Sequence, residues 1–194
     1  MSSAPGPDPI GVFDSGVGGL TVLKALRARL PHESFIYLGD TARLPYGTKS
    51  PATVARYATN IADVLVAQGV KAIVVACNTA SAFGLDAVRQ RVSVPVVDVI
   101  EPVSRAVAGD PATRRVTVLG TRGTVASGSY PRAIAALRHD VDVTQQPCPL
   151  LVPLAEEGWT SGPIPRAVVE SYLEATLVAS PPDALILGCT HYPL

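Results

Sequence analysis

Two short apolar runs, each followed by a cysteine, constrain the fold of this chain more than any other feature. Residues 72–76 form the first run and lead to Cys77, and residues 184–188 form the second and lead to Cys189. Such runs are too short to cross a membrane and are typical of strands buried in a parallel sheet. Because open α/β sheets bind ligands at the carboxyl ends of their strands, both thiols are expected at a binding edge.

The rest of the chain alternates between strand-like and helix-like segments. Leucines recur at helical spacing from residue 20, and Ser50 followed by Pro51 is a typical helix start. Residues 121–124 are predicted as a turn, and residues 149–158 as a loop or short helix. Further strands are predicted at 10–13, 34–38, 94–99, 115–120 and 141–143, and helices at 20–30, 51–68, 79–91, 130–137 and 165–179. This alternation predicts an α/β fold with parallel sheets.

The pattern also repeats once along the chain. The first strand and its glycine-bearing turn, residues 10–19, resemble residues 116–124, and the strand at 72–77 resembles the strand at 184–189. We therefore expect two pseudo-symmetric, doubly wound parallel-sheet lobes, residues 1–99 and residues 100–194, with the active site between them. The alternative explanation is that any α/β chain contains look-alike strands.

Composition and charge argue against several classes of function. Lys plus Arg and Asp plus Glu both number 16, so no net charge favours nucleic acid or an anionic membrane surface. The chain has no apolar run of the roughly 20 residues that a membrane span needs. Three scattered cysteines do not form a disulfide framework, and residues 1–9 are interpreted as a flexible leader without a secretion signal. A reducing cytoplasm is the expected compartment, and the oligomeric state stays open, a homodimer included.

The chemistry open to the thiols is nucleophilic, acid–base or metal-binding, although free cysteines are often simply buried. Cys148 is interpreted as such a packed residue. Cys77 and Cys189 each precede a predicted helix N-terminus, where the helix dipole would lower the thiol pKa from its usual value of about 8.5. His191 could join them as a third metal ligand, but no further cysteine or histidine has suitable spacing, so no metal is predicted.

Two further features bear on cofactors. The turn Asp14-Ser15-Gly16-Val17-Gly18-Gly19 fits neither the dinucleotide nor the P-loop pattern. It is interpreted as a tight turn, or as a set of N–H groups that bind a carboxylate with Asp14 directed into the cleft. Pyridoxal phosphate would need a Schiff-base lysine, and two of the three lysines, Lys24 and Lys71, are expected to be solvated; Lys49 is the third. No cofactor is predicted.

Six segments taken together resemble the glutamate racemases of the aspartate/glutamate racemase family. In chain order they are Asp14-Ser15-Gly16-Val17-Gly18-Gly19, Gly39-Asp40, Pro45-Tyr46-Gly47, Cys77-Asn78-Thr79, Glu156-Glu157-Gly158 and Cys189-Thr190-His191. Aspartate and hydantoin racemases share the paired cysteines but resemble the DSGVGG and PYG segments less well.

The resemblance implies a cofactor-independent racemase that binds glutamate between its lobes and supplies D-glutamate for peptidoglycan synthesis. It implies that Cys77 and Cys189 are the acid–base pair. It also implies that Asp14 assists Cys77 and that His191 assists Cys189. Inverting a stereocentre by proton transfer needs a base on one face and an acid on the other, and two matched thiols meet that need.

Further positions carry over from the family. The acidic ones are Asp40 and Glu156, and the substrate-binding ones, besides Asp14 and His191, are Ser15, Tyr46, Gly47, Asn78, Thr79, Thr121, Thr124 and Thr190. The resemblance also implies that the family's chain continues past residues 191–194 and returns to complete the first lobe, whereas this chain ends directly after a predicted strand. The alternatives are an aspartate or other amino-acid racemase, and a non-catalytic, truncated form that binds an acidic ligand.

Overall fold

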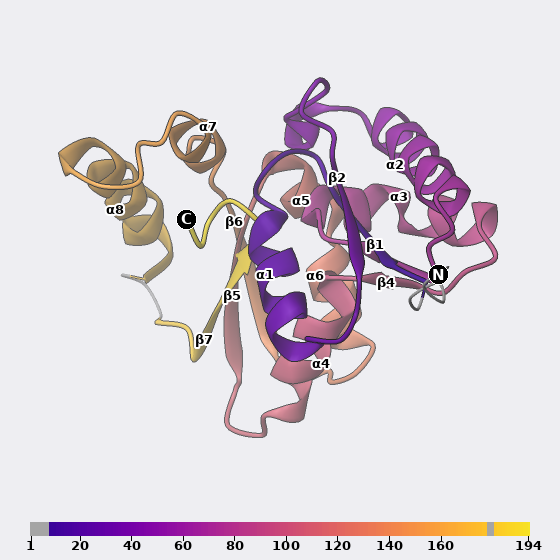
Figure 1. Ribbon diagram of the computed structural model, residues 1–194. Coiled ribbons are helices and arrows are strands. Elements are labelled where there is room, and N and C mark those ends of the chain that lie inside the picture. The colour runs from indigo at the N-terminus through magenta and orange to yellow at the C-terminus, as the bar shows by residue number, and fades with distance from the viewer. Residues whose placement is uncertain (1–7, 178–180) are drawn as a thin grey trace, which may run out of the picture.

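The computed structural model describes residues 8–177 and 181–194, and its strands form two parallel sheets (Figure 1). The predicted α/β fold with two parallel-sheet lobes is confirmed. The leader predicted for residues 1–9 lies mostly outside the described residues. The first sheet has the order β2-β1-β3-β4, formed by β1 Ile10–Asp14, β2 Phe35–Gly39, β3 Ala72–Val75 and β4 Val96–Asp98. The second has the order β6-β5-β7, formed by β5 Arg115–Gly120, β6 Asp142–Pro147 and β7 Ala184–Gly188.

The two sheets repeat one arrangement of three strands. In each, the first strand of the lobe lies between the next strand of its lobe and the strand that leads to a cysteine. Phe13 pairs with Val75 in the first sheet, and Gly120 pairs with Gly188 in the second. Because all pairings are parallel, the carboxyl ends of these strands gather at one edge of each sheet.

Helices pack on the sheets and form a core in each lobe, while Leu185 and Leu187 of β7 stay exposed. The first core packs α2 and α3 on β3 through small and branched side chains such as Ala58, Ile61 and Ile73. The second packs α4 and α6 on β5 through residues such as Val118 and Ile134. The helices are α1 Leu20–Arg29, α2 Pro51–Ala67, α3 Asn78–Arg91, α4 Ile100–Gly109, α5 Arg122–Ser127, α6 Ser129–Ala135, α7 Leu151–Glu156 and α8 Pro163–Leu177, with a 3-10 turn η1 at Tyr46–Thr48.

Most predicted elements are found, and the differences have local causes. Helix α4 was not predicted, yet Asp98 starts it by accepting the N–H groups of Ile100 and Glu101 at 3.0 and 3.3 Å. Helix α5 replaces a predicted turn because the Thr121 hydroxyl caps it by accepting the Thr124 N–H at 3.1 Å. The helix predicted to end at residue 179 is described only to residue 177, and its last two residues lie outside the described ranges.

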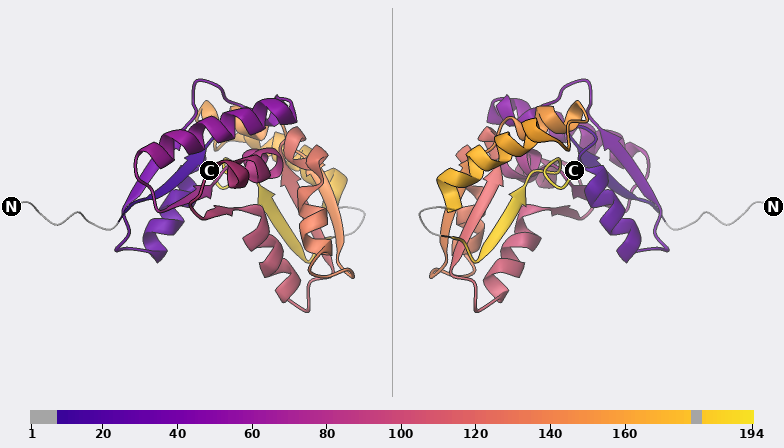
Figure 2. Two further views of the ribbon diagram at one scale, coloured as in Figure 1. Left: turned by 90° about the vertical axis from the view of Figure 1, so that its right-hand side faces the viewer. Right: turned by 90° about the vertical axis from the view of Figure 1, so that its left-hand side faces the viewer.

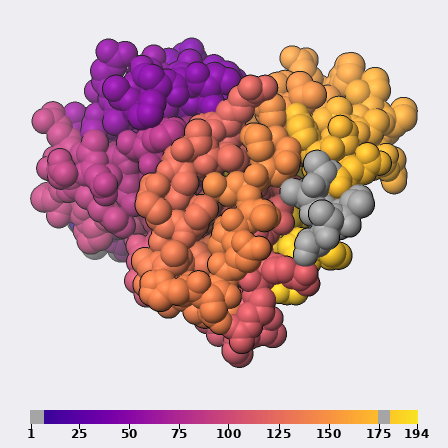
Figure 3. Space-filling model, turned by 180° about the vertical axis from the view of Figure 1, so that it is seen from behind, coloured from indigo at the N-terminus to yellow at the C-terminus, as the bar shows by residue number. Residues whose placement is uncertain are grey.

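The lobes meet along their loops and along α3 and α5. Figure 2 shows them as two arms that join at an angle, with α2 running along the first arm. From behind, the side chains of the two lobes form one continuous surface (Figure 3). Helices α3 and α5 are in contact, and α5 also touches η1. The lobes therefore bring together residues that are far apart in the sequence.

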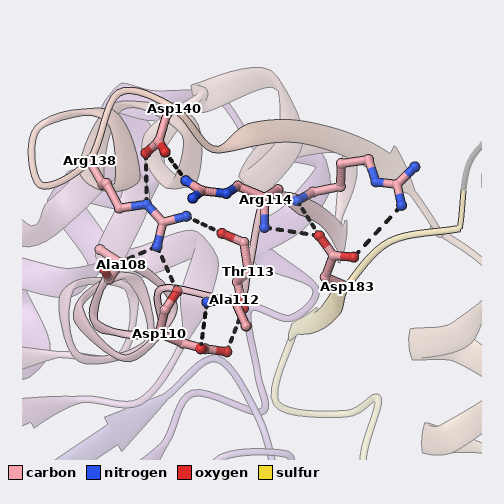
Figure 4. A network of polar contacts seen from close by, with 9 residues as sticks. Ala108, Asp110, Ala112, Thr113, Arg114, Arg138, Asp140 and Asp183 are labelled. Atoms are coloured by element: carbon pink, nitrogen blue, oxygen red, sulfur yellow. Dashed lines mark hydrogen bonds and ion pairs between the residues drawn. The ribbon is translucent and has the colours of Figure 1, made fainter.

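A polar network ties the loops together at the amino ends of the second lobe's strands, away from the cysteine-bearing edge (Figure 4). The Arg138 guanidinium donates to the backbone carbonyls of Ala108, Asp110 and Thr113, and it pairs with Asp140. The Asp183 carboxylate accepts the N–H groups of Arg114 and Arg115, at the beginning of β5. Within the described ranges, none of the helices has the length and apolar character that a membrane crossing needs.

Candidate active site

A small cavity lies where the two lobes meet. Its volume is about 20 Å³, which is room for about one water molecule. Both thiols line it, so Cys77 and Cys189 share one cavity, as their matched strands predicted. The other predicted residues on its wall are Ser15, Tyr46, Gly47, Asn78, Thr79, Thr121, Glu156, Thr190 and His191. Three apolar residues complete it without having been predicted, Leu44, Pro45 and Val152.

Cys77 lies at the start of α3, where its side chain caps the helix. Its sulfur accepts the Ala80 N–H at 3.4 Å and donates to the Ser15 hydroxyl at 3.7 Å. The predicted position at a helix N-terminus is confirmed, but the predicted lowering of the thiol pKa is wrong. Burial, and then the negative charge of Asp14, raise the pKa of Cys77 to about 12, against the smaller lowering by these hydrogen bonds.

Cys189 has different surroundings, because a turn and not a helix follows β7. The helix predicted after it is therefore absent from the described residues 181–194. Its sulfur lies 3.8 Å from His191 Nδ1, and His191 Nε2 lies 2.5 Å from Glu156 Oε1. Burial raises the pKa of the Cys189 thiol, and the nearby Cys77 and Asp14 add to that rise. Burial thus favours the neutral form of both thiols.

Asp14 is fully buried at the tip of β1 and does not line the cavity. One carboxylate oxygen accepts the Gly16 N–H at 2.9 Å, and the other accepts the Thr190 hydroxyl at 3.2 Å. The glycine-rich turn is therefore tight and binds a carboxylate, but within this chain that carboxylate is its own Asp14. A Cβ at Gly19 would lie 2.4 Å from the Asp14 Cβ, so this close approach needs glycine.

Gly18 is one of the places where the second lobe packs closely on the first. A Cβ built on Gly18 would lie 2.6 Å from both His191 Nδ1 and the Thr190 hydroxyl oxygen. No ordinary side-chain contact is this short, so glycine alone lets the imidazole beside Cys189 pack on the turn of β1.

Asp40 lies behind the wall of the cavity. It is 5% exposed, and its carboxylate accepts the Tyr46 hydroxyl at 2.5 Å and the Arg43 Nε–H at 2.8 Å. Arg43 in turn lies over the ring of Tyr57, 4.6 Å from its centroid. Asp40 therefore holds Tyr46 in the wall and does not itself reach the cavity.

Three threonine hydroxyls join the lobes beside the cavity. The Thr79 oxygen lies 3.0 Å from that of Thr121 and 3.2 Å from that of Thr124, and the last two are 3.1 Å apart. Thr79 and Thr121 line the cavity, whereas Thr124 is fully buried behind them. The triad thus places hydroxyl donors from both lobes on one wall.

One buried contact at this site was not predicted from the sequence. The Asn78 side-chain amide donates to the Tyr130 hydroxyl at 2.8 Å, across the lobes. Apolar spacing in the predicted helix at 130–137 indicates that Tyr130 is buried, but no sequence signal reveals the partner of its hydroxyl. None of the three lysines lines the cavity, and Lys71 pairs with Glu33. None of the residues that line this cavity is therefore a lysine that could form a Schiff base.

Comparison with known proteins places this geometry in context. The sequence model of the family described as Asp/Glu/Hydantoin racemase matches residues 20–194. A glutamate racemase from Geobacter metallireducens is 54% identical over 185 residues, which span 95% of this chain and 68% of that protein.

Solved structures agree with the sequence matches. The glutamate racemase from Thermus thermophilus, in complex with beta-chloro-D-alanine, superposes with a TM-score of 0.85 at 54% identity. The match covers 96% of this chain and 68% of that one. The glutamate racemase from Francisella tularensis, in complex with D-glutamate, superposes with a TM-score of 0.90 at 45% identity, covering 96% of this chain and 70% of that one.

Proposed function

Because this chain belongs to the Asp/Glu/Hydantoin racemase family, we propose that it interconverts L- and D-glutamate without a cofactor. The observation that carries the proposal is that two thiols from two lobes line one small cavity. The glutamate racemases that this chain matches at 45 to 54% identity support glutamate as the substrate, and one of them holds D-glutamate in its structure.

The reaction is a proton exchange at the α-carbon. A thiolate on one face takes the α-proton and becomes a thiol, and the thiol on the opposite face gives its proton to the carbanion and becomes a thiolate. Cys77 and Cys189 exchange these roles when the reaction runs in reverse, so the C–H bond that breaks is replaced by one on the other face. No electron acceptor or cofactor is needed for this balance.

The thiolate needs help to form, because burial keeps both thiols neutral. His191 Nδ1 is near enough to Cys189 to take its proton, and Glu156 would stabilise the imidazolium that results. Asp14 acts on Cys77 through its charge, which disfavours a second negative charge nearby. We propose that the α-ammonium of glutamate offsets this repulsion when it enters the cavity, and so makes the Cys77 thiolate accessible.

Neutral donors would bind the two carboxylates of glutamate. The residues that line the cavity supply hydroxyl and amide groups but no lysine or arginine. Fixed donors of this kind stabilise charge that develops on a carboxylate when the α-proton leaves. The binding residues proposed are Ser15, Tyr46, Gly47, Asn78, Thr79, Thr121 and Thr190, with Asp14, Asp40 and Thr124 holding them from behind.

We also propose where this activity belongs. D-Glutamate is a building block of peptidoglycan, and the cytoplasm is the proposed compartment. The three cysteines are free thiols in the structure, which suits a reducing environment. A homodimer stays a prediction, as does the division of the chain at residues 99 and 100.

Racemisation and proton exchange test the proposal together. L-Glutamate and D-glutamate should each lose optical activity with the purified chain and no added cofactor, and in deuterium oxide each should gain deuterium at the α-carbon. L-Aspartate serves as the matched substrate control and should react more slowly. Faster turnover of aspartate would overturn the substrate assignment, and binding of glutamate without deuterium uptake would overturn the catalytic one.

A further inference from the structure

Tyr130 lies between the two cysteine-bearing strand ends. It belongs to α6 of the second lobe and is 1% exposed. Its hydroxyl accepts the Asn78 amide N–H at 2.8 Å, and Asn78 directly follows Cys77. This bond crosses from the second lobe to the residue beside the first-lobe thiol.

The ring of Tyr130 reaches the other thiol's strand. A Cβ built on Gly188, the residue before Cys189, would lie 3.2 Å from the Tyr130 Cε2 atom and 2.7 Å from the Leu119 carbonyl oxygen. The ring therefore rests against the bare backbone of Gly188. One side chain thus contacts the neighbour of Cys77 with its hydroxyl and the neighbour of Cys189 with its ring.

We propose that Tyr130 is a positioning residue of the racemase, one that fixes the Asn78 amide for the substrate. The proposal rests on the proposed function. Among the described residues, Tyr130 is the one hydrogen-bond partner of the Asn78 side chain, and the bond uses one of the two amide N–H groups. The second N–H and the amide oxygen remain for a ligand in the cavity that Asn78 lines.

Packing alone does not account for a tyrosine at this position. A buried hydroxyl costs free energy unless it is hydrogen-bonded, and a phenylalanine would fill the same space without that cost. The Asn78 amide also needs an acceptor, since Asn78 is 6% exposed. With the hydroxyl removed, the Asn78 amide is free to rotate, and part of the binding free energy of the substrate is used to order it.

Tyr130→Phe tests the proposal, because it keeps the ring on Gly188 and removes only the bond to Asn78. We expect kcat/KM for glutamate to fall about fivefold to tenfold, the effect of about one net hydrogen bond. The fall should lie in KM, since binding is lost equally from the bound substrate and the transition state. The calorimetric Kd for D-glutamate should rise by the same factor, and this measurement does not depend on turnover.

Two controls separate positioning from a structural role. Tyr192→Phe removes another tyrosine hydroxyl, one that donates to the Cys148 carbonyl at 2.9 Å, and it should leave KM unchanged. In the Asn78→Ala background, Tyr130→Phe should cause no further loss, because the group it orients is gone. The proposal is overturned if Tyr130→Phe binds glutamate like wild type, if the two losses add, or if Tyr192→Phe raises KM equally. Failure of wild type to racemise while it binds D-glutamate would instead count against the proposed function.

Discussion

Cys77 and Cys189 occupy matching strand ends but have different neighbours. Cys77 caps a 14-residue helix and touches the Ser15 hydroxyl, so backbone N–H groups and a neutral side chain surround it. Cys189 is followed by a turn and lies beside His191, which pairs with Glu156. The hydrogen-bond partners of the first sulfur are therefore uncharged, whereas the second lies beside an imidazole that pairs with a carboxylate; the charge of Asp14 acts on both thiols.

The difference teaches that duplicated strands need not carry duplicated partners. The sheets repeat the order of three strands, and that repetition alone brings the two sulfurs to one cavity. The nearest partners of the two sulfurs differ, namely the Ala80 N–H of α3 for Cys77 and the His191 imidazole, which pairs with Glu156 of α7, for Cys189. Symmetry sets the positions of the thiols, and local sequence sets their chemistry.

Removing either thiol is the strongest test of this comparison. Cys77→Ser and Cys189→Ser should each lower kcat for racemisation by about 10³-fold, the scale of a general acid–base group, despite their different neighbours. In deuterium oxide, each variant should exchange the α-proton of only one enantiomer, and the two variants should prefer opposite enantiomers. Cys148→Ala is the control and should keep turnover. A variant with wild-type turnover would contradict the two-thiol mechanism.

Breaking the contact between Glu156 and His191, beside Cys189, should have the next largest effect on activity. Glu156→Gln removes the charge that stabilises protonated His191, so kcat/KM should fall by about 10²-fold. Steady-state kinetics with both enantiomers measure this change. The neighbouring Glu157→Gln alters the same charge without touching His191 and should behave like wild type. Equal behaviour of the two variants would mean that the Glu156–His191 contact has no part in catalysis.

Because Cys77 is buried, the free energy of unfolding should fall as the pH rises into the alkaline range. Its pKa is about 12 in the folded chain and about 8.5 when unfolded, so above pH 9 the unfolded chain holds fewer protons than the folded one. The contribution of the Cys77 thiol to the free energy of unfolding is therefore fully present below its pKa in the unfolded chain. It is lost as the pH rises toward its pKa in the folded chain. Between these values, the free energy of unfolding should fall about 1.4 kcal/mol per pH unit more steeply in wild type than in Cys77→Ser. Parallel pH curves from urea denaturation would contradict the assigned burial.

The smallest effect on catalysis is expected at the far end of the second lobe. Arg138→Met removes the guanidinium that joins three backbone carbonyls and Asp140 in Figure 4. The free energy of unfolding should fall by about 2 kcal/mol, because several acceptors lose a charged partner, while kcat/KM stays unchanged. Arg105→Met, which breaks an exposed pair with Glu101, should change the free energy of unfolding much less, because solvent screens that pair. A large loss of activity in Arg138→Met would show that the two ends of the lobe are coupled.

Sequence patterns predicted the strands and the pair of thiols because these depend on local apolar runs and on repetition. They missed α4 because Pro102, in its first turn, resembles a break, although Asp98 caps the helix. The lowered thiol pKa was a wrong prediction because a helix N-terminus is visible in sequence, whereas the depth of burial is not. The bond between Asn78 and Tyr130 could not be predicted, because it depends on how the two lobes meet.

The cavity between the lobes is smaller than the amino acid that it would bind. Its volume of about 20 Å³ is far smaller than a glutamate molecule, so we expect the lobes to separate when an amino acid enters or leaves. The hydrogen bonds of Thr190 to Asp14 and of Thr79 to Thr121 join the lobes beside this cavity and would resist that separation. Substrate entry and product release therefore each have an energy barrier. We expect this separation of the lobes, as well as proton transfer, to limit the turnover rate.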